Sequence, residues 1–398
     1  MNILYLSANG FPLSDSDPGG TFSLEHARAL QAEGARVLAV DLRHGAFAED
    51  ELGGLTVLRT PRLRPLLRRL RLAEFLRTIA FHTRIRRRFE YDTIIISFFY
   101  LKYLPLLLLL RRRGVTVLAI AHGGEVMPAG LLTRAFKRML FRLVDVVTPV
   151  SEYTETLLSC LIHRRNADNR KIATIPNGID ATKLAAQPER VTALREKLGI
   201  GESDFTVLSV CNLIPRKGID RVVDAVNICL DGGLPVRHVI VGRGPEADAL
   251  RQRAASAGHG ERFHFLPPVE TEDLAACFAL ADIFAMLSIT DWDERRTEGF
   301  GVTYAEAMAL GKPVIGGAGC GASEPVKHGF NGLLIDPYAA DAAAQIAAAL
   351  ERLARDRDYY TRLSDNARWH AKERFSWRAN ARRTLALIGQ AQSGASGV

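Results

Sequence analysis

Two glutamates lie on either side of a glycine turn in residues 297–314, which read TEGFGVTYAEAMALGKPV. Glu298 precedes the Gly-Phe-Gly turn, and Glu306 falls one turn into an Ala-rich helix expected to begin near Val302. Free amides at such a helix start favour an anion such as a diphosphate. Because carboxylates repel phosphate, we expect the glutamates to contact neighbouring hydroxyls, those of a ribose and a sugar. A glycoside-hydrolase carboxylate pair is the rival interpretation, but it needs no diphosphate cradle.

Two cations precede another expected helix. Arg216 and Lys217 stand just before Gly218, where positive charge is unfavourable for the helix itself. A bound phosphate would offset that cost, and a solvated basic turn is the alternative interpretation. The loop Asp291-Trp292-Asp293 has an Asp-x-Asp pattern that fits either a divalent metal or a charged surface loop.

Two loops nearer the N-terminus also follow expected strands. Gly19 and Gly20 precede a helix, although the loop does not have the GxGxxG spacing of a dinucleotide fingerprint. His122, in AHGGEV, has a side chain suited to binding a substrate hydroxyl or moving a proton. A structural histidine in a loop is equally compatible with this pattern.

Apolar β-branched runs alternate with helical patterns along the chain, and this alternation predicts the fold that positions the candidate residues. Such alternation is typical of parallel sheets covered by helices on both faces, whose ligands bind beyond the carboxyl ends of the strands. We predict an α/β protein with two doubly wound, Rossmann-like domains facing across a cleft. Their bounds are 1–185 and 186–375, and a last helix at about 376–392 returns to the first domain.

The predicted elements divide at a link near 180–200. The first half has strands at 2–7, 36–41, 55–60, 93–97, 115–120 and 146–149, and helices at 20–33, 66–89, 100–113, 130–143 and 151–160. The second half has strands at 205–210, 237–241, 262–265, 282–286 and 313–316, and helices at 217–230, 246–257, 271–279 and 302–310.

The charge of the chain is concentrated in its first half. Residues 1–185 hold 27 Lys and Arg against 17 Asp and Glu, within a net charge of +8 for all 398 residues. Residues 59–88 contain 11 arginines and one glutamate, with apolar residues at helical spacing. Such a segment is suited to an anionic membrane surface, and a packed helix with a solvated arginine face is the alternative. We expect no nucleic-acid partner, since no recognisable nucleic-acid module surrounds it.

Neither a signal peptide nor a membrane-spanning run is apparent, and the five cysteines follow no metal-binding or disulfide spacing. These features favour a reducing cytoplasm.

With these motifs in place, the chain resembles the retaining nucleotide-sugar glycosyltransferases called group 1, or family four, which have the GT-B fold. The resemblance covers essentially the whole chain and is strongest at 205–337. It is carried by IPNGID at 175–180, RKG at 216–218, ALADIFAMLS at 279–288, EGFGVTYAE at 298–306 and SEPVKHGFNGLLIDP at 323–337.

The resemblance implies a role for individual residues. Glu298 would hold hydroxyls of the transferred sugar, Glu306 those of the ribose, and Lys217 would neutralise the diphosphate. His122 would contact the sugar. Backbone contacts with the donor would come from Val269 at the nucleobase and from Phe300, Gly301 and Val302 near the sugar and diphosphate. Gly19 and Gly20 would lie beside the donor phosphate or the acceptor.

One position departs from the family pattern. Asn212 stands where the family usually has a phosphate-binding arginine, and we hypothesise that Arg216 replaces its charge. The resemblance implies retaining transfer of a sugar from a UDP- or GDP-sugar to a glycan or lipid-linked acceptor. We expect no metal or other cofactor and a peripheral location on the inner face of the cytoplasmic membrane. The alternatives are a nucleotide-sugar 2-epimerase of similar shape and a non-catalytic nucleotide-sugar or membrane-binding partner.

Overall fold

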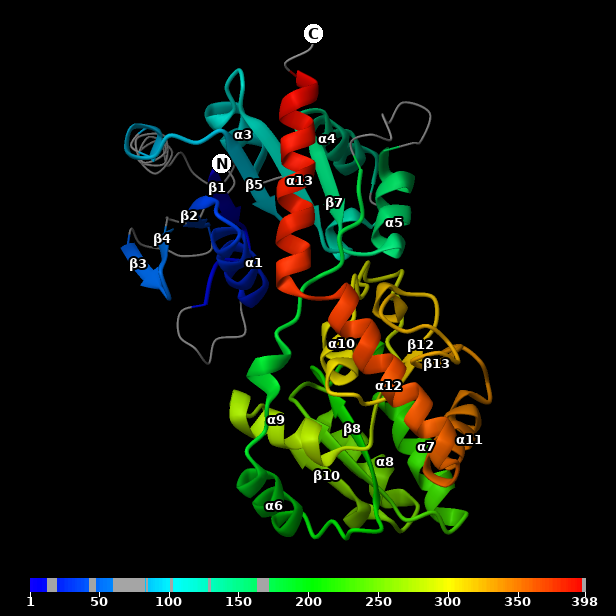
Figure 1. Cartoon of the computed structure of the whole chain (residues 1–398). Helices are drawn as coiled ribbons and strands as arrows, with labels where there is room; N and C mark the ends of the chain where they lie inside the picture. Colours follow the sequence, from blue (N-terminus) through cyan, green and yellow to red (C-terminus); the bar gives the residue numbers. More distant parts are fainter. Residues whose placement is uncertain are drawn as a thin grey trace. The chain divides into compact units, whose positions relative to one another are not determined.

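The structure is a computed structural model that describes residues 1–12, 20–42, 48–59, 83, 85–100, 103–127, 130–162 and 172–395. The chain forms two compact units, one of Met1–Gly178 with Trp377–Val398 and the other of Ile179–Ser376 (Figure 1). Gly19 and most of the basic segment 59–88, with its expected helix at 66–89, lie outside the described residues. In the described part of the chain, no helix combines the length and the apolarity needed to span a bilayer.

The first unit is built on a sheet whose described strands lie in the order β3-β4-β2-β1-β5-β6-β7. Neighbours are parallel, except that β3 and β4 form an antiparallel hairpin. The strands are β1 Asn2–Ser7, β2 Arg36–Asp41, β3 Ala48–Leu52, β4 Leu55–Arg59, β5 Thr93–Ser97, β6 Thr116–Ala121 and β7 Val146–Pro149. The accompanying helices are α1 Thr21–Ala32, α3 Leu104–Leu110, α4 Leu131–Arg142, α5 Glu152–Ile162 and α13 Trp377–Ala395.

The second unit has a wholly parallel sheet in the order β10-β9-β8-β11-β12-β13. Its strands are β8 Phe205–Val210, β9 Val236–Val241, β10 Phe263–Leu266, β11 Ile283–Met286, β12 Val314–Gly317 and β13 Gly332–Ile335. Its helices are α6 Pro188–Lys197, α7 Ile219–Asp231, α8 Ala247–Ser256, α9 Thr271–Leu280, α10 Val302–Ala309, α11 Ala342–Arg355 and α12 Arg357–Arg374. Both sheets are doubly wound, because the strand order reverses beside β1 in one and beside β8 in the other.

Strands buried on both faces explain the apolar runs of the sequence. Every residue of β5 and β6 is buried, as expected when helices cover both sides of a parallel sheet. All the strands predicted from these runs are present, with ends that differ by no more than one residue. The hairpin strand β3 and the edge strand β13 were not predicted. The helix predicted at 100–113 is shorter, since α3 has Pro105 in its first turn and ends at Leu110.

Helix α13 belongs to the first unit although it follows α12 of the second (Figure 1). Trp377, its first residue, stacks on the imidazole of His26 from α1 with ring centroids 6.2 Å apart. Arg378 and Arg382 both donate to the carboxylate of Glu33, at 3.0 and 2.7 Å. The last helix is therefore fixed to the first unit by an aromatic contact and a shared carboxylate.

Candidate active site

The predicted cations and Glu298 meet at the switch point of the second sheet. Strands β8 and β11 are neighbours there. The strand that follows β8, β9, lies on one side of this pair, and the strand that follows β11, β12, lies on the other side. The loop after β8 carries Arg216 and Lys217, and the loop after β11 carries Glu298. Ligands of doubly wound folds bind beyond the carboxyl ends of strands at such a point. Residues that are about 80 positions apart are thereby brought into direct contact.

Both cations bind the same oxygen atom of Glu298. Its Oε2 accepts hydrogen bonds from Lys217 Nζ at 2.6 Å and from Arg216 Nη1 at 2.7 Å. The Lys217 side chain is 9% exposed, whereas those of Arg216 and Glu298 are just over one-fifth exposed. Burial alone would raise the pKa of Glu298, but the charges of Lys217 and Arg216 outweigh it and lower that pKa. The carboxylate is therefore ionised and held between two cations.

Glycines let the loops of this site approach one another at backbone distance. Gly218 caps α7 with φ 62°, and a Cβ atom there would lie 2.4 Å from the carbonyl oxygen of Leu287. A Cβ atom on Gly321 would lie 2.2 Å from the carbonyl oxygen of Gly299. A side chain at Gly218 would push the loop that carries Lys217 away from the loop after β11, and a side chain at Gly321 would push the loop after β12 away from the backbone beside Glu298. The spacing of the cations from the carboxylate thus depends on both glycines.

Helix α10 starts immediately after the Gly-Phe-Gly turn, as predicted. No side chain caps its N-terminus at Gly301, so the amides of its first turn are not used by a capping residue. The helix is anchored by Tyr304, which is fully buried and donates to the carbonyl oxygen of Met286 in β11. Phe300 packs edge-on against Phe375 with ring centroids 5.5 Å apart. The helix start is thus held at the carboxyl end of β11. The amide of Val302 donates to the carbonyl oxygen of Phe300 at 3.1 Å, and no capping side chain binds the amides of the first turn.

Glu306 lies in α10 and differs from Glu298 in its surroundings. Burial raises its pKa from 4.5 to about 7, and no neighbouring cation contributes to the shift. The two predicted carboxylates therefore have opposite electrostatic character: the charges of its partners lower the pKa of Glu298, whereas burial raises the pKa of Glu306. A ligand that donates hydroxyl hydrogens to Glu306 would favour its ionised form.

The remaining predicted residues of the second unit lie in nearby or adjoining loops. Val269 is half-buried in the loop between β10 and α9. Asn212 is exposed at the start of the loop after β8, so it leaves Arg216 as the guanidinium beside Lys217. The carboxylate of Asp291 accepts a hydrogen bond from the amide of Glu294 at 2.9 Å, and thus helps to close the turn of its own loop.

His122 lies at the carboxyl end of β6 in the first unit, between two phenylalanine rings. Phe98 stacks on it with centroids 4.0 Å apart, and Phe22 meets it edge-on at 4.4 Å. Phe98 has φ 75°, a strained conformation for a bulky residue that places its ring against the imidazole. Burial lowers the pKa of His122 to about 3, so the ring is neutral. Its Nε2 is buried, with no hydrogen-bond partner among the described residues.

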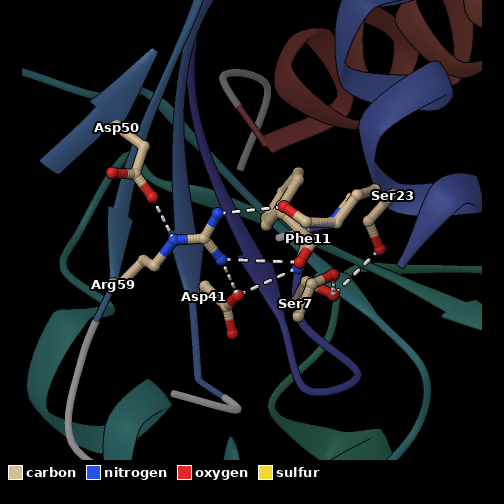
Figure 2. A network of polar contacts seen from close by, with 8 residues as sticks. Ser7, Phe11, Ser23, Asp41, Asp50 and Arg59 are labelled. Atoms are coloured by element: carbon tan, nitrogen blue, oxygen red, sulfur yellow. Dashed lines mark hydrogen bonds and ion pairs between the residues drawn. The ribbon is translucent and has the colours of Figure 1, made fainter. Parts of the chain in front are cut away.

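A buried ion pair supports the loop that leads towards the predicted glycine pair. Arg59 ends β4 and is 2% exposed, and Asp41 ends the neighbouring strand β2 and is fully buried (Figure 2). The guanidinium Nη1 lies 2.8 Å from Asp41 Oδ2, while its Nε binds Asp50. Nη2 donates to the carbonyl oxygen of Pro12 at 2.9 Å.

Other polar atoms near this ion pair hold the backbone of the loop after β1. The amide of Phe11 donates to Asp41 Oδ2 at 3.0 Å. Ser7, at the end of β1, shares a hydrogen bond with Ser23 of α1 at 2.8 Å (Figure 2). Gly20 has φ 87°, and a Cβ atom there would lie 2.4 Å from the carbonyl oxygen of Gly10, so the two ends of the loop meet. Neither Arg59 nor Asp41 was predicted as a site residue, although each is the charged last residue of its strand.

Comparisons with known proteins agree with this fold. Residues 191–370 match the family described as glycosyl transferases group 1, and residues 19–183 match glycosyltransferase family 4. Solved structures of similar fold include Anabaena HepE in complex with UDP and glucose, with a TM-score of 0.74 and 22% identity over 98% of this chain and 100% of that one. Sucrose-phosphate synthase from Thermosynechococcus elongatus has a TM-score of 0.74 and 21% identity over 99% of this chain and 100% of that one. The fold is thus GT-B.

Curated relatives of known name identify the family of this chain. A GDP-mannose-dependent alpha-(1-6)-phosphatidylinositol monomannoside mannosyltransferase from Mycolicibacterium smegmatis is 31% identical over 70% of this chain and 72% of its own length. The enzyme of that name from Mycobacterium tuberculosis is 34% identical, and the match spans 66% of each chain. A D-inositol 3-phosphate glycosyltransferase from Geodermatophilus obscurus is 34% identical over 54% of this chain and 47% of its own length. This chain belongs to the group 1, family 4 type of glycosyltransferases.

Proposed function

We propose that this chain is a retaining hexosyltransferase that moves a sugar from a nucleoside-diphosphate donor to a hydroxyl of a lipid-linked or glycan acceptor. Among UDP- and GDP-sugars, GDP-mannose is the first donor to test, because the mannosyltransferase relatives use it. Their acceptor, a phosphatidylinositol monomannoside, makes an inositol-containing glycolipid the first acceptor to test. The proposed setting is the inner face of the cytoplasmic membrane, with the basic segment 59–88 and helix α4 in contact with lipid.

The observation that carries the proposal is the contact of Lys217 and Arg216 with one oxygen of Glu298. Two cations against one carboxylate leave a net positive charge at the switch point of the sheet. The uncapped first turn of α10 adds amides that favour an anion. A diphosphate would take up the excess positive charge, and Arg216 would supply the guanidinium that Asn212 lacks.

The proposed chemistry follows from where charge develops. When the bond between sugar and diphosphate breaks, negative charge grows on the leaving diphosphate, and Lys217, Arg216 and the α10 amides stabilise it without a metal. Glu298 accepts hydrogen bonds from sugar hydroxyls and holds the anomeric carbon in position. Because no residue is assigned as a covalent nucleophile, an oxygen of the leaving diphosphate would take the proton of the attacking hydroxyl on the same face.

Two further residues, one from each unit, have roles in this proposal. Glu306, once ionised, would accept hydrogen bonds from the ribose hydroxyls. His122 is neutral at the pH of the cell, so it would bind a sugar hydroxyl rather than act as a cation. Its Nε2 atom, which has no hydrogen-bond partner among the described residues, is the group that such a hydroxyl would satisfy.

A donor and acceptor panel tests the proposal. Purified protein would be incubated with GDP-mannose, other GDP-sugars and UDP-sugars, with and without a phosphatidylinositol mannoside, and in the presence of EDTA. We expect nucleoside diphosphate release that depends on the acceptor, survives EDTA and gives a product of unchanged anomeric configuration. Conversion of the donor without acceptor would instead identify a 2-epimerase. Binding of donor without any turnover would identify a non-catalytic partner.

A further inference from the structure

Helix α4 exposes an apolar face to solvent. Five of its twelve residues are both apolar and exposed, and at about 100° per residue they fall within an arc of about 140°. Their exposed fractions are far above those of core residues, at 86% for Leu131, 72% for Leu132, 42% for Phe136 and 41% for Met139. Ala135 completes the face.

The face is unusual because the helix already has a packed side. Leu140 and Phe141 are buried in the core of the first unit, so the exposed residues are not needed to attach α4 to the sheet. Other large apolar side chains that the structure shows as exposed are more widely spread along the chain, for example Ile228 at 44% and Trp369 at 58%. A contiguous apolar face of this kind marks an interaction surface.

Positive charge borders the apolar face. The sequence of α4, LLTRAFKRMLFR, has four cations, Arg134, Lys137, Arg138 and Arg142, and no acidic residue. Arg142 is exposed at the end of the face, and Arg134 and Arg138 lie along one side of it. Lys137 interacts with the carboxylate of Glu125, so its charge is partly offset. Arg138 is half-buried and donates through Nε to the carbonyl oxygen of Leu161 at 3.2 Å, but it keeps its charge. With half-buried Arg134 and exposed Arg142, it gives α4 a positive border that suits an anionic surface.

We propose that α4 is a docking helix that lies flat on a bilayer containing anionic phospholipid. At 1.5 Å per residue its twelve residues are about 18 Å long, too short to span a bilayer but suited to its interface. The apolar face would enter the acyl boundary, and the arginines would meet lipid phosphates. This inference deepens the proposed function by naming a surface that would bring the chain to a lipid-linked acceptor. Unlike the membrane contact predicted for the basic segment 59–88, this proposal rests on exposed apolar residues.

The test is a vesicle-binding assay that needs neither donor nor acceptor, so its failure is separate from a failure of transferase activity. Vesicles of phosphatidylcholine with an equal part of phosphatidylglycerol, and vesicles of phosphatidylcholine alone, would be sedimented with the full chain. The test variant is Leu132→Gln with Phe136→Gln, and its matched control is Ile228→Gln with Trp369→Gln. Far-ultraviolet circular dichroism and melting temperature would establish that each variant is folded.

We expect the intact chain to bind the anionic vesicles, and the α4 variant to bind them at least tenfold more weakly. The control should bind like the intact chain. Arg134→Gln with Arg142→Gln should weaken binding severalfold and reduce its sensitivity to salt, because each arginine near an anionic surface contributes separately.

Three results would overturn the proposal. The first is equal vesicle binding by the folded α4 variant and the intact chain. The second is loss of binding only when arginines of segment 59–88 are replaced, for example Arg68, Arg69 and Arg71. The third is self-association in sedimentation velocity that disappears with Leu132→Gln and Phe136→Gln in a chain that does not bind vesicles, which would make α4 a protein interface.

Discussion

The Oε2 atom of Glu298 lies 2.6 Å from the Nζ atom of Lys217, although the residues are 81 positions apart in the chain. The contact joins the loops after β8 and β11, and Arg216 binds the same oxygen. The carboxylate of Glu298 is therefore an anion that both cations hold. A diphosphate would compete for these cations and leave Glu298 available to accept hydrogen bonds from a sugar.

Removal of Lys217 should mainly weaken donor binding. After Lys217→Ala, Glu298 and Arg216 neutralise one another, and no excess positive charge remains for a diphosphate. We expect GDP affinity to fall by about 10- to 100-fold, the range for loss of a hydrogen bond to a charged group. Isothermal titration calorimetry would measure it, with Arg251→Ala on α8 as the control because that arginine pairs with Asp248 instead.

Arg216→Ala should weaken GDP binding as well, since Arg216 is expected to supply the charge missing at Asn212. The same calorimetric comparison tests this substitution. If Arg216→Ala leaves the affinity unchanged while Lys217→Ala abolishes binding, the replacement of the arginine missing at position 212 is refuted.

Glu306 should make donor binding depend on pH. Because burial raises its pKa to about 7, the carboxyl is mostly protonated below that pH and mostly ionised above it. Hydroxyl donors bind the ionised form, so donor affinity should rise as pH rises through about 7. Glu306→Gln should remove this component and leave only the titration of the nucleotide itself. Identical pH profiles for both proteins would contradict the assignment.

The same shift affects stability in the opposite direction. The unfolded chain ionises Glu306 near 4.5, whereas the folded chain keeps the proton up to about 7. The contribution of Glu306 to the free energy of unfolding is therefore fully present below pH 4.5 and is lost as the pH rises to about 7. Urea titrations of the wild type and Glu306→Gln over this range would show a smaller pH-dependent decline in the variant. A steeper decline in the variant would show that the sign is wrong.

Arg59 should be a major contributor to the stability of the first unit. Arg59→Met would leave Asp41 buried without its cation, a change that typically costs about 3–5 kcal/mol. Addition of Asp41→Asn should recover part of the loss, because the unpaired charge is removed. The control is Arg88→Met, which breaks an exposed pair with Glu49 and should change stability little. Equal urea midpoints for the Arg59 and Arg88 variants would contradict this role.

Local patterns in the sequence were sufficient to predict most of the fold. Runs such as TIIIS at β5 and TVLAIA at β6 are apolar because both sheet faces are covered, and that signal is strong over a few residues. Strand β3, AEDEL, lacks it because it is exposed at a sheet edge and is defined by its antiparallel partner β4. Strand β13, GLLI, is apolar but only four residues long at the edge of its sheet, and a run of that length does not distinguish a strand from other apolar segments.

The candidate site was only partly predictable, because its contacts depend on strand order. The motif around Glu298 and the cations at 216–217 were recognised separately, but their pairing follows from β8 and β11 being neighbours. The pair of Arg59 with Asp41 likewise depends on β4 lying beside β2. The predicted role of Gly19 is untested, since that residue lies outside the described part of the chain.

Glu298→Gln separates the two functions that the account assigns to this carboxylate, and it is the most direct test of the central claim. Removal of the negative charge frees Lys217 and Arg216 for a diphosphate, but removes the acceptor that positions the sugar. Calorimetry with GDP and turnover with the donor and acceptor would be measured on the same protein. The control is Glu294→Gln, whose carboxylate pairs with Arg296 in the same loop.

The predicted result is GDP affinity equal to or tighter than that of the wild type, together with transfer slower by roughly 100-fold. A folded Glu298→Gln protein that loses GDP affinity and turnover in parallel would contradict the account, because Glu298 would then serve to organise the cations rather than to hold the sugar.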